Sequence, residues 1–284
     1  MAITAAQVNE LRKKTGAGMM DCKKALTEAG GDFEKAIEIL RKKGASVAAK
    51  RAEKSANEGI VLTKIVDEGK TGIIVEVNCE TDFVAKGEDF INFANEVMNV
   101  VDSKRPANME ELLSDEALKS KMADLLGKVG EKIELSRFAI EKSENGLVVD
   151  YVHMGSKLGV LVRFDNSGDA NTELAEIGKD IAMQVAAMDP ICVKREEVPS
   201  DTINKEIEIY KEISRKEGKP EQILEKIATG KLNKFYQENC LIEQAYIKDN
   251  SKSVNDLLKE LNSKHGTNAT IALFHRFHLG DEKK

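Results

Sequence analysis

The chain has 284 residues, which is long enough for about two or three domains with cores of their own. Charged residues make up 32% of it and aromatic residues 5%, a balance typical of a helix-rich protein with extensive polar surface. The net charge of −6 argues against direct nucleic-acid binding, and no apolar run approaches the roughly 20 residues that span a membrane.

The first 44 residues predict three short helices. Thr4 to Gln7 has the pattern of a capping box, and the helix that it opens ends at Thr15-Gly16. A second helix runs from about Met19 to Ala29, and a third is capped by Asp32 and ended by Gly44. Residues 1–44 are therefore interpreted as a docking domain, because small helical bundles usually bind a partner rather than catalyse a reaction.

Met19 and Met20 stand next to each other at the start of the second helix. Both cannot face one small core, so one of them is predicted to be exposed for a partner; a Met that fills the bundle is an equally good alternative. Residues 41–54 carry six basic side chains and one acidic side chain. Residues 45–56 are therefore interpreted as a basic helical linker with a solvated face, and an RNA contact is the less favoured interpretation.

Residues 59–101 and 146–188 repeat each other without gaps, at an offset of 87 positions (146 − 59 = 87). Identical residues at equivalent positions are Gly59 and Gly146, Val61 and Val148, Lys70 and Lys157, Gly72 and Gly159, Val75 and Val162, and Asp82 and Asp169. Each copy predicts a β-hairpin, a loop and a helix. The fold is therefore predicted to be α+β, with a two-lobed core whose lobes span 57–145 and 146–284.

The loop from Asn78 to Lys86 joins a β-branched strand to a helix with one apolar stripe. From the loop alone, Phe83 is expected to fold into the core and Asp82 to cap the next helix. The repeat argues otherwise, because the second copy has Ala170 in place of Phe83, so a shared core does not require the ring. The comparison favours a displayed Phe83, an apolar wedge beside an acid.

Between the repeats, residues 110–130 predict a helix and 133–142 a strand. After Pro190, residues 201–217 and 221–238 carry apolar residues nearly every 3.5 positions. They predict an antiparallel coiled-coil hairpin at about 201–238, inserted in the second lobe. Its inner stripe is predicted to consist of Ile203, Ile207, Tyr210, Ile213, Ile223, Leu224, Ile227 and Leu232.

Tyr246-Ile247 is predicted to resume a strand, Ser253 to cap a helix through Lys264, and 268–278 to complete the sheet.

No enzyme motif stands out. The sequence has no P-loop, zincin or kinase signature, and His153 has no Ser or Cys nucleophile at a recognisable elbow. Glu80 and Asp82 could form a carboxylate pair, so an enzyme is kept as the second hypothesis. Neither a cofactor nor a metal site is predicted.

The four cysteines are scattered, with no close pair that would suggest zinc or redox chemistry. The N-terminus has no basic segment followed by an apolar run, so nothing directs export. Both observations favour a cytoplasmic protein with reduced thiols.

Three stretches closely resemble the bacterial elongation factor Ts family. They are Thr15 to Leu26 (TGAGMMDCKKAL), Asn78 to Lys86 (NCETDFVAK), and a segment from Tyr151 to Leu161. The resemblance covers almost the whole chain, and its first two motifs are highly specific. It implies a ubiquitin-associated-like N-terminal domain, a two-lobed α+β core and an inserted coiled-coil hairpin.

The resemblance also implies a function. The family promotes GDP release from elongation factor Tu so that GTP can rebind, and it acts as a guanine nucleotide exchange factor by protein binding and not as an enzyme. No nucleotide or metal site is then needed in this chain. The stoichiometry stays open between a one-to-one complex, a homodimer and a two-by-two complex, and so does the role of the hairpin.

By the family motif, the partner-binding residues would be Arg12, Met19, Met20, Lys23, Thr81, Asp82, Phe83, Val84, His153 and Ile247. The first four would dock on the nucleotide domain of the partner. Asp82 and Phe83 would enter near its Mg²⁺ and phosphate region, and His153 would assist from the second lobe. Ile247 aligns with a further contact, although Lys248 stands where the family usually has an apolar residue.

Overall fold

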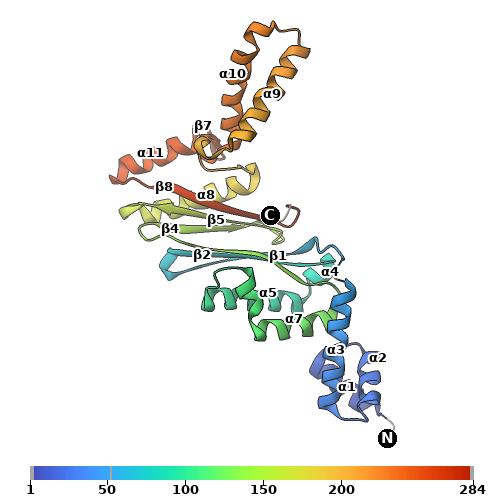
Figure 1. The fold of residues 1–284 in the computed structure, drawn as a ribbon. Helices are drawn as coiled ribbons and strands as arrows, with labels where there is room; N and C mark the ends of the chain where they lie inside the picture. The colour runs from blue at the N-terminus through green and yellow to red at the C-terminus, as the bar shows by residue number, and fades with distance from the viewer. Residues whose placement is uncertain (1–2, 52, 282–284) are drawn as a thin grey trace.

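The computed structural model describes residues 3–51 and 53–281, and it gives the backbone alone for residues 45–50. Two three-stranded antiparallel sheets lie face to face, and helices cover their outer faces (Figure 1). The first sheet has the order β1–β2–β3 (Glu58–Val66, Thr71–Cys79 and Glu134–Lys142). The second has the order β4–β5–β8 (Leu147–Val152, Leu158–Asp165 and Thr270–His278). The predicted α+β fold is confirmed.

The first sheet packs against α5 (Glu88–Lys104) and α7 (Glu116–Val129) through one buried apolar cluster. The single helix predicted over 110–130 is wrong, because the structure has α6 (Met109–Ser114) and then α7. Asp115 separates them, and its carboxylate accepts a hydrogen bond from the Leu118 N–H (2.9 Å). The helix is interrupted at this residue because the Asp115 cap satisfies a backbone donor in the first turn of α7.

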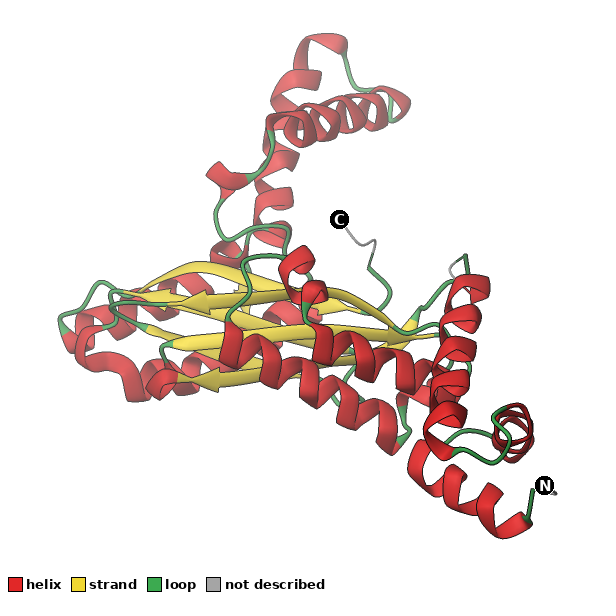
Figure 2. Ribbon diagram, turned by 60° about the horizontal axis from the view of Figure 1, so that its bottom comes forward, coloured by secondary structure: helices red, strands yellow, loops and turns green. Residues whose placement is uncertain are grey.

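The second sheet packs in the same way against α8 (Asn171–Met188) and α11 (Val254–His265). Figure 2 shows helices on both outer sides of the layered strands. Ser253 caps α11, as predicted, and its hydroxyl accepts a hydrogen bond from the Asp256 N–H (3.1 Å). The remaining short elements are the turns η1 (Asp67–Gly69), η2 (Gly168–Ala170), η3 (Arg195–Glu197) and η4 (Leu241–Glu243), and the strands β6 (Ala245–Tyr246) and β7 (Asp249–Ser253).

The internal repeat places equivalent residues in reciprocal contact between the two sheets. A Cβ added to Gly72 would lie 2.5 Å from Cγ1 of Val148, and one added to Gly159 would lie 2.6 Å from Cγ1 of Val61. These glycines are equivalent in the repeat, and so are the two valines. The glycines let the two sheets approach closely, and the apolar cluster between the sheets contains both valines.

We expect Gly72→Ala and Gly159→Ala to lower the free energy of unfolding by similar amounts, about 1–3 kcal/mol each. The added methyl group meets a β-branched side chain that has little rotamer freedom. Chemical denaturation of each variant measures the effect. Gly230→Ala is the control, because an added Cβ there meets nothing within 4 Å inside a helix and should leave stability unchanged or slightly raised. A neutral result at both sheet positions would contradict the close packing.

The N-terminal helices are α1 (Ala5–Thr15), α2 (Met19–Glu28) and α3 (Phe33–Arg51), and they share a separate apolar cluster. The capping box at Thr4 and the end of α1 at Gly16 are confirmed. Asp32 accepts hydrogen bonds from the N–H groups of Glu34 (3.0 Å) and Lys35 (3.1 Å), as expected of a cap.

The prediction that Gly44 ends the third helix is wrong, because α3 continues to Arg51. A Cβ added to Gly44 would lie 3.1 Å from the carbonyl oxygen of Ala123 and 3.4 Å from the Cα of Gly127. Gly44 therefore allows α3 to pack closely on α7 and does not stop the helix. The helical linker predicted over 45–56 coincides in part with this extension, and the exposure of the side chains at 45–50 lies outside the described residues.

The helices α9 (Ser200–Lys216) and α10 (Glu221–Asn239) form an antiparallel hairpin that projects from the second sheet's side of the molecule (Figures 1 and 2). Six of the eight residues predicted for its inner stripe are buried or partly buried, and the partly buried ones are Ile203, Ile207, Tyr210 and Ile227. Ser214, Leu224, Ala228 and Leu232 are buried, whereas Ile213 and Ile223 are 41% and 42% exposed. The buried positions drift around each helix relative to a strict 3.5-residue repeat, because an ideal helix has 3.6 residues per turn.

Candidate partner-binding site

The loop that follows β2 displays an aromatic ring to solvent. Phe83 lies in the single helical turn α4 (Asp82–Ala85), and 85% of its surface is exposed. Thr81 caps this turn, because its hydroxyl accepts a hydrogen bond from the Val84 N–H (3.4 Å). Ala85 and part of Val84 pack into the first sheet's apolar cluster, which leaves Phe83 pointing outward. The alternative in which Phe83 fills the core is therefore wrong.

Two glutamates hold this loop in place. The Thr81 N–H and hydroxyl donate to the two carboxylate oxygens of Glu131 (3.0 and 2.7 Å). Glu80 accepts from the Lys132 N–H (2.7 Å) and pairs with the Arg51 guanidinium (2.6 Å). Burial opposes the ionisation of Glu80, but these two partners outweigh it and lower its pKa. The loop is thus anchored to the start of β3 and to the end of α3, so the position of Phe83 is largely preformed.

A carboxylate stands beside the ring. Asp82 pairs with the Lys86 ammonium at 2.7 Å, and that hydrogen bond lowers the pKa of Asp82. The positive charge of Lys157 acts in the same direction. Asp82 is therefore ionised at neutral pH, and the loop presents a negative charge next to an apolar surface.

The turn between β4 and β5 lies at the same end of the two sheets as Phe83. Lys157 in this turn pairs with Glu58 (2.6 Å), and Glu58 faces Cys79 where β2 ends. His153 is exposed, and its Nδ1 is 2.9 Å from the Tyr151 hydroxyl oxygen. The structure therefore brings His153 of the second lobe to the same rim as the Thr81–Val84 turn of the first.

The sequence interpretation missed Met154, which is 91% exposed beside His153. It also missed Met188 at the end of α8 and Ile191 just after it, which are 53% and 51% exposed. The end of α8 lies near the same rim, because Asp189 pairs with Arg276 of β8 (3.3 Å). The available signal was a large apolar residue within two positions of a glycine or proline, Gly155 for Met154 and Pro190 for Met188 and Ile191.

The strand predicted at Tyr246-Ile247 is confirmed for Tyr246, which lies in β6, and is wrong for Ile247. Ile247 occupies the tight turn between β6 and β7 and is 47% exposed. Its N–H donates to the side-chain oxygen of Gln184 in α8 (3.0 Å), and the neighbouring Lys248 pairs with Asp180 (2.7 Å). The α8 contacts hold this turn on the second sheet's helical side.

The four predicted N-terminal residues lie on a separate surface. Met19 and Met20 are 51% and 62% exposed, so both methionines face solvent rather than one. Arg12 and Lys23 are exposed as well. This surface belongs to α1 and α2, which lie beyond α7 and away from the sheets (Figure 1).

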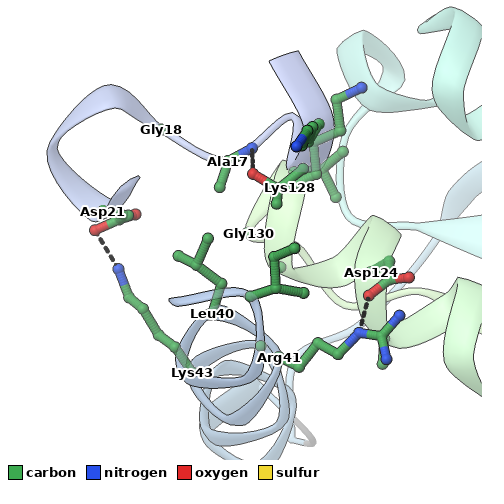
Figure 3. A pocket seen from close by; sticks show the side chains of 16 residues that line it. Ala17, Gly18, Asp21, Leu40, Arg41, Lys43, Asp124, Lys128 and Gly130 are labelled. Atoms are coloured by element: carbon green, nitrogen blue, oxygen red, sulfur yellow. Dashed lines mark hydrogen bonds and ion pairs between the residues drawn. The ribbon is translucent and has the colours of Figure 1, made fainter. Parts of the chain in front are cut away.

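A cavity of about 460 Å³ lies between the N-terminal helices and α7, beside the close contact of α3 with α7 (Figure 3). Its charged groups are matched within the chain, since Lys43 pairs with Asp21 and Arg41 pairs with Asp124 (3.2 Å). Both pairs involve α3, which runs on to the Glu80 loop. Arg41–Asp124 joins α3 to α7 and so helps to orient the N-terminal helices on α7, whereas Lys43–Asp21 joins α3 to α2.

Within residues 3–51 and 53–281, no group of three or more His, Cys, Asp or Glu side chains is arranged to hold a metal ion. Over the same part of the chain, no helix combines the length and apolar character that crossing a bilayer requires. An anchored rim of exposed apolar and charged side chains on an α+β scaffold is typical of proteins that bind another macromolecule.

Comparison with known proteins gives the particular family. The family model described as "Elongation factor TS" matches residues 80–281. The elongation factor Ts of Chlorobium phaeobacteroides is 50% identical over 286 residues, which cover 98% of this chain and 99% of the relative. Those of Chloroherpeton thalassium and Clostridium kluyveri are each 45% identical over 99% of this chain and cover 99% and 95% of their own lengths. The chain belongs to the elongation factor Ts family and is a translation elongation factor.

Proposed function

We propose that this chain is the guanine nucleotide exchange factor of elongation factor Tu and acts in the cytoplasm. The α4 turn enters the partner near its Mg²⁺ and phosphate site, GDP leaves, and GTP rebinds. Family membership supports this proposal, and one observation carries it: Phe83 is 85% exposed on a loop that Glu80 and Glu131 anchor.

The driving force is burial of an exposed ring. Transfer of a Phe side chain from water into the partner contributes about 1.5–3 kcal/mol, and the anchored loop loses little conformational entropy on binding. That free energy displaces the elements around Mg²⁺, an ion that demands near-octahedral geometry. The ionised Asp82 adds electrostatic competition near the metal. Coupling is reciprocal, so GDP weakens binding of the exchange factor as much as the factor weakens GDP binding.

The other residues have distinct roles in this proposal. Thr81 and Val84 position the turn, since Thr81 bonds to Glu131 and Val84 packs against the core. His153 extends the rim around Phe83, and Ile247 makes a further contact on the α8 side. Arg12, Met19, Met20 and Lys23 dock on the nucleotide domain of elongation factor Tu.

We assign four parts to the chain. Residues 1–44 form a ubiquitin-associated-like docking domain, and 45–56 a basic linker. Residues 57–145 and 146–284 are the two lobes of the core, and a coiled-coil hairpin is inserted at about 201–238. The separate apolar cluster of the N-terminal helices supports the first boundary.

Release of labelled GDP from elongation factor Tu tests the function. We expect catalytic amounts of this protein to accelerate release in the presence of excess unlabelled nucleotide, and to do so equally with GDP or GTP as competitor. Binding of the protein to elongation factor Tu without faster release of GDP would contradict the exchange mechanism.

The hairpin is expected to contribute little to exchange. Its ion pairs, such as Arg215 with Glu221 (2.6 Å), join its own two helices. Replacement of residues 201–238 by a short Gly/Ser turn should leave the rate of GDP release nearly unchanged. A fall of tenfold or more, about 1.4 kcal/mol, would show that the hairpin touches the partner. Ile209→Ser, which alters a residue that is 48% exposed, then tests its apolar surface alone.

A further inference from the structure

Two cysteines that are far apart in the sequence meet where the α9–α10 hairpin joins the core. Cys192 precedes the hairpin and Cys240 follows α10, and their Sγ atoms are 3.7 Å apart. We call the segments around these two residues, 191–195 and 239–243, the hairpin root. The sequence gives no sign of the pair, because 48 positions separate the two thiols.

The backbone of the hairpin root holds the two cysteines in register. They face each other in a parallel β-bridge. The Leu241 N–H donates to the Cys192 carbonyl (3.0 Å), and the Ile191 N–H donates to the Asn239 carbonyl (2.9 Å). Facing residues of neighbouring strands have Cα atoms about 4.8 Å apart, which lies within the range that a disulfide bridges. Rotation of the side chains therefore brings the sulfurs to bonding distance without backbone movement.

Side-chain contacts reinforce this arrangement. Arg195 makes two hydrogen bonds to the Glu243 carboxylate (2.7 and 2.5 Å). Its guanidinium also lies over the Tyr236 ring, 4.7 Å from the ring centre. The root is thus fixed across both of its segments, independently of any covalent link.

The two thiols differ in access. Cys192 is partly exposed, whereas Cys240 is completely buried. Burial raises the pKa of both thiols, and that of Cys240 reaches about 12. An incoming reagent therefore meets Cys192 first, and reaction is slow at neutral pH and faster at alkaline pH because the thiolate is the nucleophile.

We propose that Cys192 and Cys240 form a reversible dithiol–disulfide site that reacts with low-molecular-weight disulfides. The Cys192 thiolate attacks the reagent's S–S bond and releases one thiol, which leaves a mixed disulfide. Cys240 then loses its proton to solvent and attacks Sγ of Cys192, and the second thiol leaves. The protein loses two electrons and two protons, and the reagent is reduced to two thiols. This site is independent of the exchange function proposed above.

The product is a covalent link across the hairpin root. It closes the chain segment that contains both α9 and α10, so it restricts the unfolded chain and prevents the root from opening. Cys22 and Cys79 lack a partly exposed thiol with which the reaction could begin, because both are fully buried.

The experiment treats the full-length protein with oxidised glutathione at about pH 7 and pH 9, followed by alkylation, non-reducing digestion and mass spectrometry. We expect one cross-link, between the peptides that contain Cys192 and Cys240, which forms faster at pH 9 and disappears with dithiothreitol. The oxidised protein should also melt at a higher temperature, by roughly 5 °C or more.

Two variants isolate the steps. Cys240→Ala should trap glutathione on Cys192, because the resolving thiol is absent, and Cys192→Ala should leave Cys240 unmodified in the folded protein. The proposal is overturned by a stable glutathione adduct on Cys192 in the parent protein, by disulfides between chains, or by a cross-link that forms only in denaturant. Circular dichroism verifies that each variant is folded before treatment.

Discussion

Phe83→Ala is expected to slow GDP release from elongation factor Tu by roughly tenfold or more while the free protein melts almost as before. The ring is 85% exposed, so its removal should change the free energy of unfolding by about 1 kcal/mol or less. Without the ring, the complex lacks the apolar burial that drives displacement of the partner's Mg²⁺ site. That burial contributes about 1.5–3 kcal/mol. Stopped-flow release of labelled GDP and thermal melting measure the two effects separately.

Phe90→Ala is the matched control for stability. Phe90 lies seven positions further along, is only 1% exposed, and belongs to the first sheet's core. Its truncation should cost about 3–5 kcal/mol through lost burial and a cavity. Asp82→Ala should slow release less than Phe83→Ala, because it removes a charge and not the apolar wedge. The wedge mechanism would be rejected if the Phe83→Ala protein were badly destabilised. It would also be rejected if that protein melted normally and released GDP from elongation factor Tu at the parental rate.

Removal of the N-terminal helices is expected to weaken binding to elongation factor Tu at least tenfold, about 1.4 kcal/mol, while the core stays folded. A chain that begins near Asn57 keeps β1 and all three apolar clusters of the core, and the cluster of the N-terminal helices is separate from them. It loses the exposed Met19 and Met20. Calorimetric titration with nucleotide-free elongation factor Tu measures the affinity.

The full-length variant Met20→Ala is the control for this truncation, because it removes one exposed side chain and leaves the packing of α3 on α7 intact. It should weaken binding in the same direction by a smaller factor. Loss of cooperative melting in the truncated chain would reject the separate domain, and unchanged affinity in both proteins would reject its docking role.

Local chemistry made much of this fold predictable. Thr4, Asp32 and Ser253 have side chains that bond to nearby backbone groups, so the sequence around each of them identifies a helix start. The repeat identified the hairpin–loop–helix unit twice, and Ala170 correctly argued against a core position for Phe83.

What could not be predicted depends on distant contacts. Gly44 has the appearance of a helix stop, but its role is set by Ala123 and Gly127 of a helix about 80 positions away. The pairing of Cys192 with Cys240 depends in the same way on how the hairpin root closes. The residues that anchor the Phe83 loop could not be predicted either, because Glu131, which accepts a hydrogen bond from Thr81, lies 50 positions further along the chain.

The reciprocal glycine–valine contacts between the sheets give the core an internal symmetry. Gly72 meets Val148 while Gly159 meets Val61, which is the self-complementary contact pattern of a two-fold symmetric dimer. The core thus has an internal pseudo-two-fold arrangement, in which the two halves of one chain meet as two identical subunits would. A dimer of identical units would carry the same loop at both ends. A single chain has no such constraint, so one loop displays Phe83 while its counterpart carries the small, buried Ala170.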